Sequence, residues 1–281
     1  MKAARRYQRA DGAAILTIDC DDAGRSRLRE LYQRAPCRML FPGGERDEPL
    51  QAVLLTTTGG LTGGDRISIE FNVARGGCAS LTAQAAEKLY RALPTEAAVQ
   101  CAISVTADAA AWAEWLAQET ILFNGARLRR TFCADLHPGA RLLAVESVVF
   151  GREAMGEDFR TGLLHDSWRI RRGGRLVWAD ALRLEGDIHS QRQAPYGLGQ
   201  ARACATLVYA GSDAGALLEP LRTVLEPFGE GCGVTVLDEV LIARLLDEDA
   251  ARLRLWVMRA AGFIRHSVTG LSDRMPRVWS C

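Results

Sequence analysis

The sequence lacks the short motifs that mark many nucleotide, metal and hydrolytic sites. No Gly-Lys-Ser/Thr triplet and no Gly-x-Ser-x-Gly elbow occur, so neither a Walker phosphate loop nor an α/β-hydrolase nucleophile is predicted. The eight cysteines include no Cys-x-x-Cys pair. The four histidines are too far apart in the sequence for a tight imidazole metal site, and we expect them in turns or at the surface. They are His137, His165, His189 and His266.

Long apolar runs and a strong net charge are also missing. No segment approaches the roughly 18 apolar residues of a membrane span, and no apolar run follows the basic residues 1–10 as it would in a secretory signal. A net charge of +1 argues against a nucleic-acid-binding surface. Without an export signal, scattered cysteines indicate reduced thiols. We therefore expect a cytoplasmic protein without membrane or nucleic-acid contacts.

The sequence does contain ample apolar residues and many short alternating segments. Of its 281 residues, 48% are hydrophobic, which is enough for one packed core. We expect a single domain over residues 1–281, with residues 1–29 as an N-terminal edge segment. Strands are predicted where short segments alternate or are rich in β-forming residues. These segments are residues 50–57, 66–73, 78–83, 98–106, 111–116, 120–133, 141–150, 164–172 and 175–184.

A faint repeat is present among these strands. Segments that begin at Gly77, Ala110 and Gly139 each follow a turn-like stretch and open a predicted strand, at spacings of 33 and 29 residues. Repeats on this scale favour stacked β-layers over a two-sheet sandwich.

The pattern changes after residue 188. Residues 188–200 read as a long loop, whereas 214–228 and 247–268 place apolar residues at helical spacing. The second predicted helix has an acidic first turn and Gly270 as its stop signal. Between the helices, a hairpin is predicted from residues 234–237 and 240–246.

A glycine-rich loop precedes one predicted strand. Residues 59–66 read Gly-Gly-Leu-Thr-Gly-Gly-Asp-Arg and lead into the alternating segment 67–73. In phosphate-binding loops the glycines are followed by a helix, whereas here a predicted strand follows them. This difference argues against nucleotide binding. A tight connection between strands explains the glycines, since glycine adopts bends that other residues resist.

The same loop begins a resemblance to the urease accessory proteins called UreD or UreH. Five segments in family order carry it: 59–66, 87–91 (Glu-Lys-Leu-Tyr-Arg), 114–123 (Glu-Trp-Leu-Ala-Gln-Glu-Thr-Ile-Leu-Phe), 151–157 (Gly-Arg-Glu-Ala-Met-Gly-Glu) and 276–279 (Pro-Arg-Val-Trp). The resemblance spans about residues 30 to 281. Ala117 and Glu153 stand where the family usually carries proline, and we expect both to alter a turn rather than the function. The motif residues that we select as a candidate interface are Gly59, Gly60, Gly63, Gly64, Arg66, Lys88, Tyr90 and Arg91.

Four carboxylates lie inside or beside apolar segments: Asp65, Glu119, Glu146 and Asp180. Burial of a carboxylate is costly unless it is paired, hydrogen-bonded or hydrated. Each carboxylate either lies solvated on an outward face or faces an internal, water-filled passage, where oxygen ligands would hold a divalent ion weakly. Glu146 is the strongest candidate for such a passage, and its neighbours Val145 and Ser147 should then point to the opposite face. A buried structural ion pair is the third explanation for Glu146.

The resemblance implies a mainly β fold, with right-handed β-helix-like layered strands and two α-helices near the C-terminus. It also implies a scaffold, not an enzyme, for nickel insertion into apo-urease, in complex with UreF and the GTPase UreG. Nickel would bind only transiently, and no tightly bound cofactor is expected. The alternatives are a β-helical hydrolase or lyase that uses Asp65, Glu119 or Glu146 as acid-base groups, and an interaction module without an ion path.

The sequence contains more tryptophan side chains than we expect one core to bury. The six are Trp112, Trp115, Trp168, Trp178, Trp256 and Trp279. We therefore expect an exposed apolar interface and poor solubility in the absence of UreF.

Overall fold

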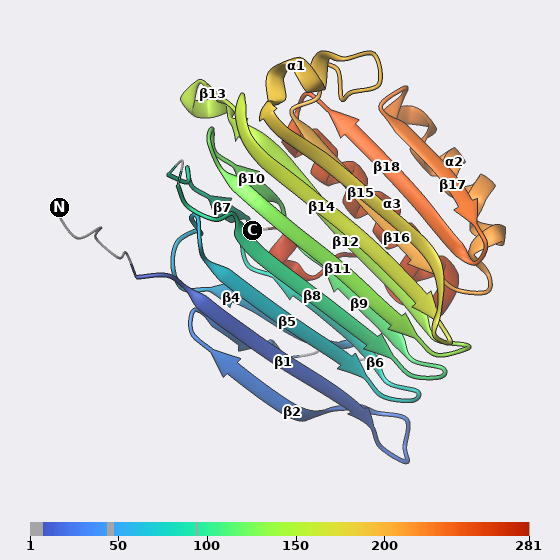
Figure 1. The fold of residues 1–281 in the computed structure, drawn as a ribbon. Coiled ribbons are helices and arrows are strands. Elements are labelled where there is room, and N and C mark those ends of the chain that lie inside the picture. The colour runs from blue at the N-terminus through green and yellow to red at the C-terminus, as the bar shows by residue number, and fades with distance from the viewer. Residues whose placement is uncertain (1–7, 44–47, 94, 281) are drawn as a thin grey trace.

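The fold consists of two stacked β-sheets with helices on one outer face (Figure 1). The computed structural model describes residues 8–43, 48–93 and 95–280. In order across the seven-stranded sheet lie β15 (Arg175–Asp187), β14 (Thr161–Arg172), β11 (Arg127–Leu136), β8 (Val99–Ala107), β5 (Arg66–Val73), β1 (Asp11–Cys20) and β2 (Ser26–Arg34). The eleven-stranded sheet contains, in order, β17 (Cys232–Leu237), β18 (Val240–Asp247), β16 (Ala203–Ala210), β12 (Arg141–Arg152), β9 (Trp112–Leu116), β6 (Cys78–Ala83), β4 (Leu50–Thr56) and β3 (Cys37–Leu40). Off this order, β10 (Thr120–Leu122) pairs with β12 and β7 (Glu87–Leu89), and β13 (Glu157–Asp158) pairs with β12.

Successive strands alternate between the two sheets from β4 to β14, apart from the short strands β7, β10 and β13. Within the eleven-stranded sheet β4, β6, β9 and β12 pair in parallel, and within the other sheet β5, β8, β11 and β14 do the same. The repeat seen in the sequence corresponds to successive parallel strands of one sheet, in which the aligned partners Cys78, Trp112 and Arg141 lie 34 and 29 residues apart. The prediction of a mainly β protein is confirmed. Successive strands of the chain thus stack in parallel within two packed sheets. The finer prediction, a right-handed β-helix, stays a prediction.

Alternation along the strands builds two cores. In β5 the side chains of Ile67, Ile69 and Phe71 are buried between the sheets, while Ser68 and Glu70 point to solvent. The second core lies between the eleven-stranded sheet and the helices α2 (Leu218–Leu225) and α3 (Ala250–Thr269). The inner face of each sheet therefore belongs to one shared core, which is where a buried site can form.

Capping residues set the ends of α3. Asp249 accepts hydrogen bonds from the backbone N–H groups of Ala251 and Arg252, and Gly270 ends the helix with φ 72°. No helix among the described residues is long and apolar enough to cross a membrane. The short 3₁₀ turns are η1 (Glu153–Met155), η2 (Ala214–Leu217), η3 (Glu226–Phe228) and η4 (Arg277–Trp279).

Three predictions about elements need correction. Residues 120–133 form two strands, because Gly125 with φ 82° turns the chain from β10 in one sheet to β11 in the other. The loop predicted at 188–200 begins with the helix α1 (Ile188–Gln193), whose first turn is capped by Asp187. The N-terminal strands β1 to β3 and strand β16 were not predicted.

The prediction of an exposed tryptophan surface is wrong. The exposed fractions are 5% for Trp112, 6% for Trp115, 2% for Trp168, 7% for Trp178 and 2% for Trp279, and Trp256 is half-buried. The rings are buried in two separate cores. Several of the indole N–H groups donate hydrogen bonds to buried acceptors.

Candidate functional site

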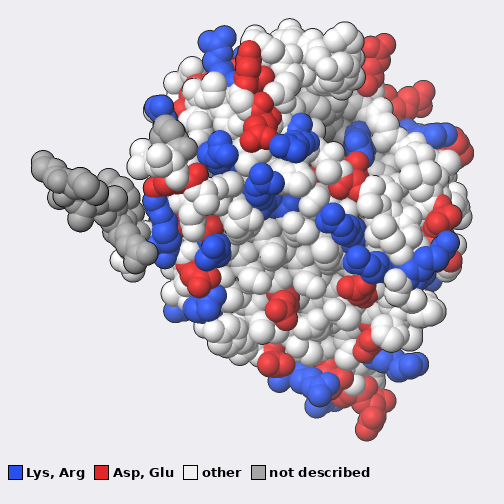
Figure 2. Space-filling view, in the orientation of Figure 1, with Lys and Arg blue, Asp and Glu red and all other residues white. Residues whose placement is uncertain are grey.

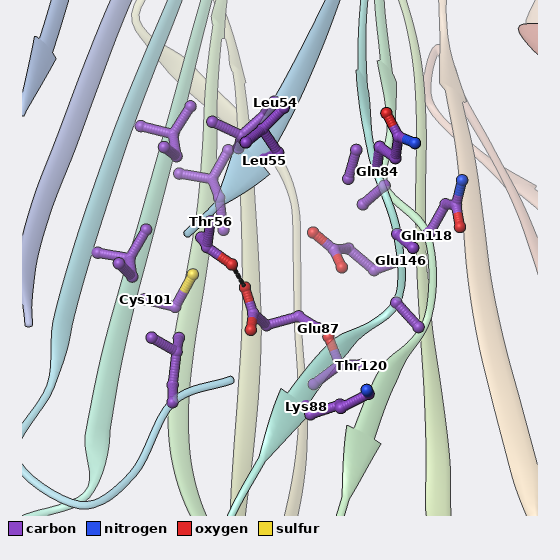
Figure 3. Close-up of a pocket in the computed structure, with 18 of the residues that line it drawn as sticks. Leu54, Leu55, Thr56, Gln84, Glu87, Lys88, Cys101, Gln118, Thr120 and Glu146 are labelled. Carbon is purple, nitrogen blue, oxygen red and sulfur yellow. Dashed lines mark hydrogen bonds between the residues drawn. The ribbon is translucent and has the colours of Figure 1, made fainter. Parts of the chain in front are cut away.

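A cavity of about 260 Å³ lies between the inner faces of the two sheets (Figure 3). Apolar side chains of both sheets form most of its wall, including Ile103 from β8 and Leu81 from β6. Polar groups enter from several elements. They are Thr56, Thr82, Gln84, Glu87, Lys88, Cys101, Gln118, Thr120, Arg130 and Glu146.

Glu146 projects from β12 into the space between the sheets. It is 3% exposed and lies on the same face as Ala144 and Val148, while Val145 belongs to the second core. The expected opposite orientation of Val145 is confirmed. One carboxylate oxygen of Glu146 accepts a hydrogen bond from the Trp115 indole at 2.8 Å, and the other accepts from Arg130. Glu146 is therefore not a solvated surface residue.

Arg130 joins Glu146 to a second carboxylate. From β11 its guanidinium binds Asp166 of β14 in a bidentate manner, with N–O distances of 2.9 and 2.6 Å. It also donates to the Thr120 hydroxyl at 3.0 Å. This cluster carries one positive and two negative charges when all groups are ionised, so it has a net charge of −1. Burial raises the pKa of Glu146 to about 7, although the positive charge of Arg130 opposes the shift.

Glu87 is the second carboxylate of the cavity. It lies on the short strand β7 and accepts a hydrogen bond from the Thr56 hydroxyl at 2.7 Å, as Figure 3 shows. Burial raises its pKa, against the effect of that hydrogen bond. The Cys101 thiol faces the same space from β8, and burial raises its pKa to about 12. The thiol is thus protonated at neutral pH and a poor metal ligand there.

The glycine loop forms one end of the cavity. Gly59 and Gly60 line it, and the Tyr90 hydroxyl donates to the Gly59 carbonyl at 2.9 Å. Gly60 has φ 141°, and a Cβ atom there would lie 2.5 Å from the Tyr90 ring. The backbone of Leu61 exchanges hydrogen bonds with Lys88 and Tyr90 at 2.7 and 2.8 Å. The loop and the 87–91 motif are therefore one packed unit, which explains why glycine is needed.

The other motif residues lie around this unit. Gly63 packs against Ala92, and Gly64 has φ 88°. Arg66 is exposed at the start of β5. The Arg91 side chain covers Gly125, and its carbonyl accepts from the Thr62 hydroxyl at 3.2 Å.

The remaining predicted carboxylates lie outside the cavity. Asp65 accepts hydrogen bonds from the backbone N–H groups of Ala10 and Thr62, both at 2.8 Å, so it closes a turn. Glu119 is paired with Arg254 at 2.7 Å. Asp180 on the edge strand β15 is paired with Arg244 on β18, so this pair links the two sheets. Of the four predicted residues, all within the described part of the chain, Glu146 alone borders the cavity.

The sequence interpretation missed Glu87, Arg130 and Asp166 as site residues. The sequence did contain a signal for Arg130 and Asp166. Arg130 occupies the same inward-facing alternate positions as Leu128 and Phe132, and Asp166 occupies those of the apolar inward residues of β14. Opposite charges on the inward faces of two strands suggest a buried pair. Among the described residues, no group of three or more His, Cys, Asp or Glu side chains is arranged to hold a metal ion.

Comparisons with known proteins cover nearly the whole chain. A family model described as UreD urease accessory protein matches residues 10–280. The chain is similar to "Urease accessory protein UreD" of Magnetococcus marinus (strain ATCC BAA-1437 / JCM 17883 / MC-1), with 47% identity over 262 residues, 91% of this chain and 89% of that protein. It is 40% identical over 281 residues to the protein of that name from Methylobacterium sp. (strain 4-46), covering 98% and 96% of the two chains. The protein from Rhizobium leguminosarum bv. trifolii (strain WSM2304) is also 40% identical, over 278 residues.

Proposed function

The chain belongs to the UreD urease accessory protein family, and from that premise we propose that it is a scaffold through which nickel reaches apo-urease. In this proposal it acts in the cytoplasm within a hetero-oligomer of UreF, the GTPase UreG and the urease apoprotein. Nickel is cargo, and GTP hydrolysis belongs to UreG. The chain itself is not an enzyme.

The observation that carries the proposal is the cavity between the sheets. Two carboxylates, Glu87 and Glu146, line it together with hydroxyl and carboxamide oxygens. Oxygen ligands bind divalent transition metals more weakly than imidazole or thiolate ligands do. A site that must pass its ion onward needs such weak binding, because tight binding would slow release.

Arg130 also supports weak binding of the cation in the cavity. Its guanidinium donates to the Glu146 carboxylate that would attract the cation. A positive charge within hydrogen-bonding distance repels a divalent ion and lowers its affinity for the site. Asp166 neutralises Arg130 in turn, so the cluster keeps a slight negative charge and still favours cation entry.

The alternative hydrolase or lyase would use Asp65, Glu119 or Glu146 as acid-base groups, and of these three described residues only Glu146 lines the cavity. Asp65 and Glu119 lie outside the cavity, each with its own hydrogen-bond partners. The cavity volume of about 260 Å³ is also below the roughly 300–1,000 Å³ of most small-molecule sites. The structure therefore favours passage of an ion over conversion of an organic substrate.

Co-expression with the urease proteins tests the proposal. We expect the double variant Glu87→Gln/Glu146→Gln to lower the nickel content of purified urease several-fold while it still co-purifies with its partners. Glu70→Gln, on the solvent-facing side of β5, is the matched control and should leave nickel loading unchanged. Normal nickel content with the double variant, or normal loading without this chain at all, would contradict the proposal.

A further inference from the structure

Arg130 divides its guanidinium between the cavity and the structure beside it. Its Nε and Nη2 atoms donate to Asp166 at 2.9 and 2.6 Å, whereas Nη1 donates to Glu146 and, at 3.0 Å, to the Thr120 hydroxyl. Thr120, Arg130 and Glu146 line the cavity. Asp166, which is also a described residue, lies outside it. One nitrogen therefore serves the cavity, and the other two anchor the side chain.

The contact between Arg130 and Glu146 can be given up without leaving a buried group unpaired. If Nη1 leaves Glu146, it keeps the Thr120 hydroxyl as an acceptor, and the bidentate pair with Asp166 is untouched. One oxygen of Glu146 then stays held by the Trp115 indole at 2.8 Å, while its other oxygen becomes free. A carboxylate that is oriented by one hydrogen bond and open at its second oxygen is suited to bind a cation.

Charge favours replacement of this contact by a divalent cation. Arg130 brings one positive charge to Glu146, and Coulomb attraction grows in proportion to charge, so a doubly charged ion attracts the same carboxylate more strongly. The pair with Asp166 meanwhile neutralises Arg130, so the displaced guanidinium does not face the incoming ion as an unpaired charge.

We propose that Arg130 is the counter-ion of the unloaded cavity, which binds Glu146 while no metal is present and yields this carboxylate to a divalent cation without leaving Asp166. Arg130 is then a positioning residue, and Asp166 sets from outside the cavity how readily Glu146 is released. When the cation moves on, Nη1 returns to Glu146. This return favours release of the ion, because the buried carboxylate is not left unpaired.

The exchange rests on the proposed function for the identity of the cargo, nickel. It concerns the affinity of the purified chain for the ion, whereas the proposed function is tested by the nickel content of urease. If the affinity shifts as expected but nickel loading does not depend on Glu87 and Glu146, the proposed function fails and the exchange stands. If loading depends on both carboxylates and the affinity does not shift, the exchange alone fails.

Titration of the purified full-length chain with nickel chloride in a calorimeter tests the exchange. Asp166→Asn removes the anchoring charge, so Arg130 should bind Glu146 more strongly and the affinity for nickel should fall by about fivefold or more. Arg130→Met/Asp166→Leu removes both members of a neutral pair and frees Glu146, so the affinity should rise by about tenfold or more. A structural role alone would not produce this rise. Titrations at pH 7 and 8 reveal any competition from proton binding at Glu146 as a pH dependence.

A second ion pair between the two sheets supplies the control. Arg244→Met/Asp180→Asn removes a pair that lies outside the cavity, and the affinity for nickel should stay within about twofold. Circular dichroism and thermal melts establish that each variant is folded. If Asp166→Asn does not fold, the double variant at Arg130 and Asp166 decides alone, because apolar replacement of a whole buried pair is tolerated better than removal of one partner. An affinity of that double variant equal to or below the wild-type value, or an unchanged affinity in folded Asp166→Asn, would overturn the proposal.

Discussion

The raised pKa of Glu146 gives a prediction about stability. Its pKa is about 7 in the folded protein, against 4.5 for an ordinary glutamic acid, because burial disfavours its charged form. Between these two values the folded state binds the proton more tightly than the unfolded state does. Proton binding by Glu146 therefore stabilises the fold at low pH, and this contribution is lost as the pH rises to 7 and above.

The size of the effect follows from the shift. A difference of 2.5 pKa units, from 4.5 to about 7, makes the folded protein lose about 2.5 kcal/mol between pH 5 and pH 8 through this group alone. Glu146→Gln cannot titrate and should lack this loss. Urea unfolding of both proteins at pH 5, 6, 7 and 8 gives the difference in free energy of unfolding, in which contributions from groups that do not interact with Glu146 cancel. A difference that stays constant over this range would refute the assignment of a raised pKa to Glu146.

Two further predictions concern residues outside the cavity. Arg265→Met leaves the fully buried carboxylate of Glu114 without its ion pair, so we expect the free energy of unfolding to fall by about 3–5 kcal/mol in thermal or chemical unfolding. Arg244→Met removes the more exposed pair with Asp180 and should cost less than about 1 kcal/mol. Gly60→Ala forces a side chain into a backbone conformation with φ 141° and against the Tyr90 ring, and it should destabilise the fold by about 1–3 kcal/mol; an unchanged melting temperature would show that the loop adapts without strain.

Local pattern was sufficient to predict much of the sheet structure. Residues 66–73 and 78–83 were predicted with the bounds of β5 and β6, because turn residues flank a clean two-residue period in each case. The repeat of 33 and 29 residues corresponds to parallel strands of one sheet. By contrast, β2 is exposed along most of its length at the sheet edge, so it lacks the apolar alternation that reveals a strand.

The site was less predictable because its residues meet only through tertiary structure. Glu146 was recognised from its apolar neighbours, and its inward orientation followed from the two-residue period. Its contact with Arg130 joins the two sheets, and no local pattern encodes how strands of different sheets align. Asp65 was equally suggestive in the sequence, yet backbone N–H groups of a turn satisfy it. A buried carboxylate that closes a turn and one that lines a cavity have the same sequence signature.

The most direct test of the account is to block the cavity and measure the nickel content of urease. Cys101→Phe directs a large side chain into the cavity from β8, whereas Cys133→Phe directs it outward from the neighbouring strand β11 of the same sheet. Figure 2 shows this outer face, which no helix of the described chain covers over its centre. With both variants folded and co-purifying with urease, we expect metal analysis to find nickel-depleted urease for Cys101→Phe and normal nickel content for Cys133→Phe. Normal nickel content with Cys101→Phe would contradict a route through the cavity.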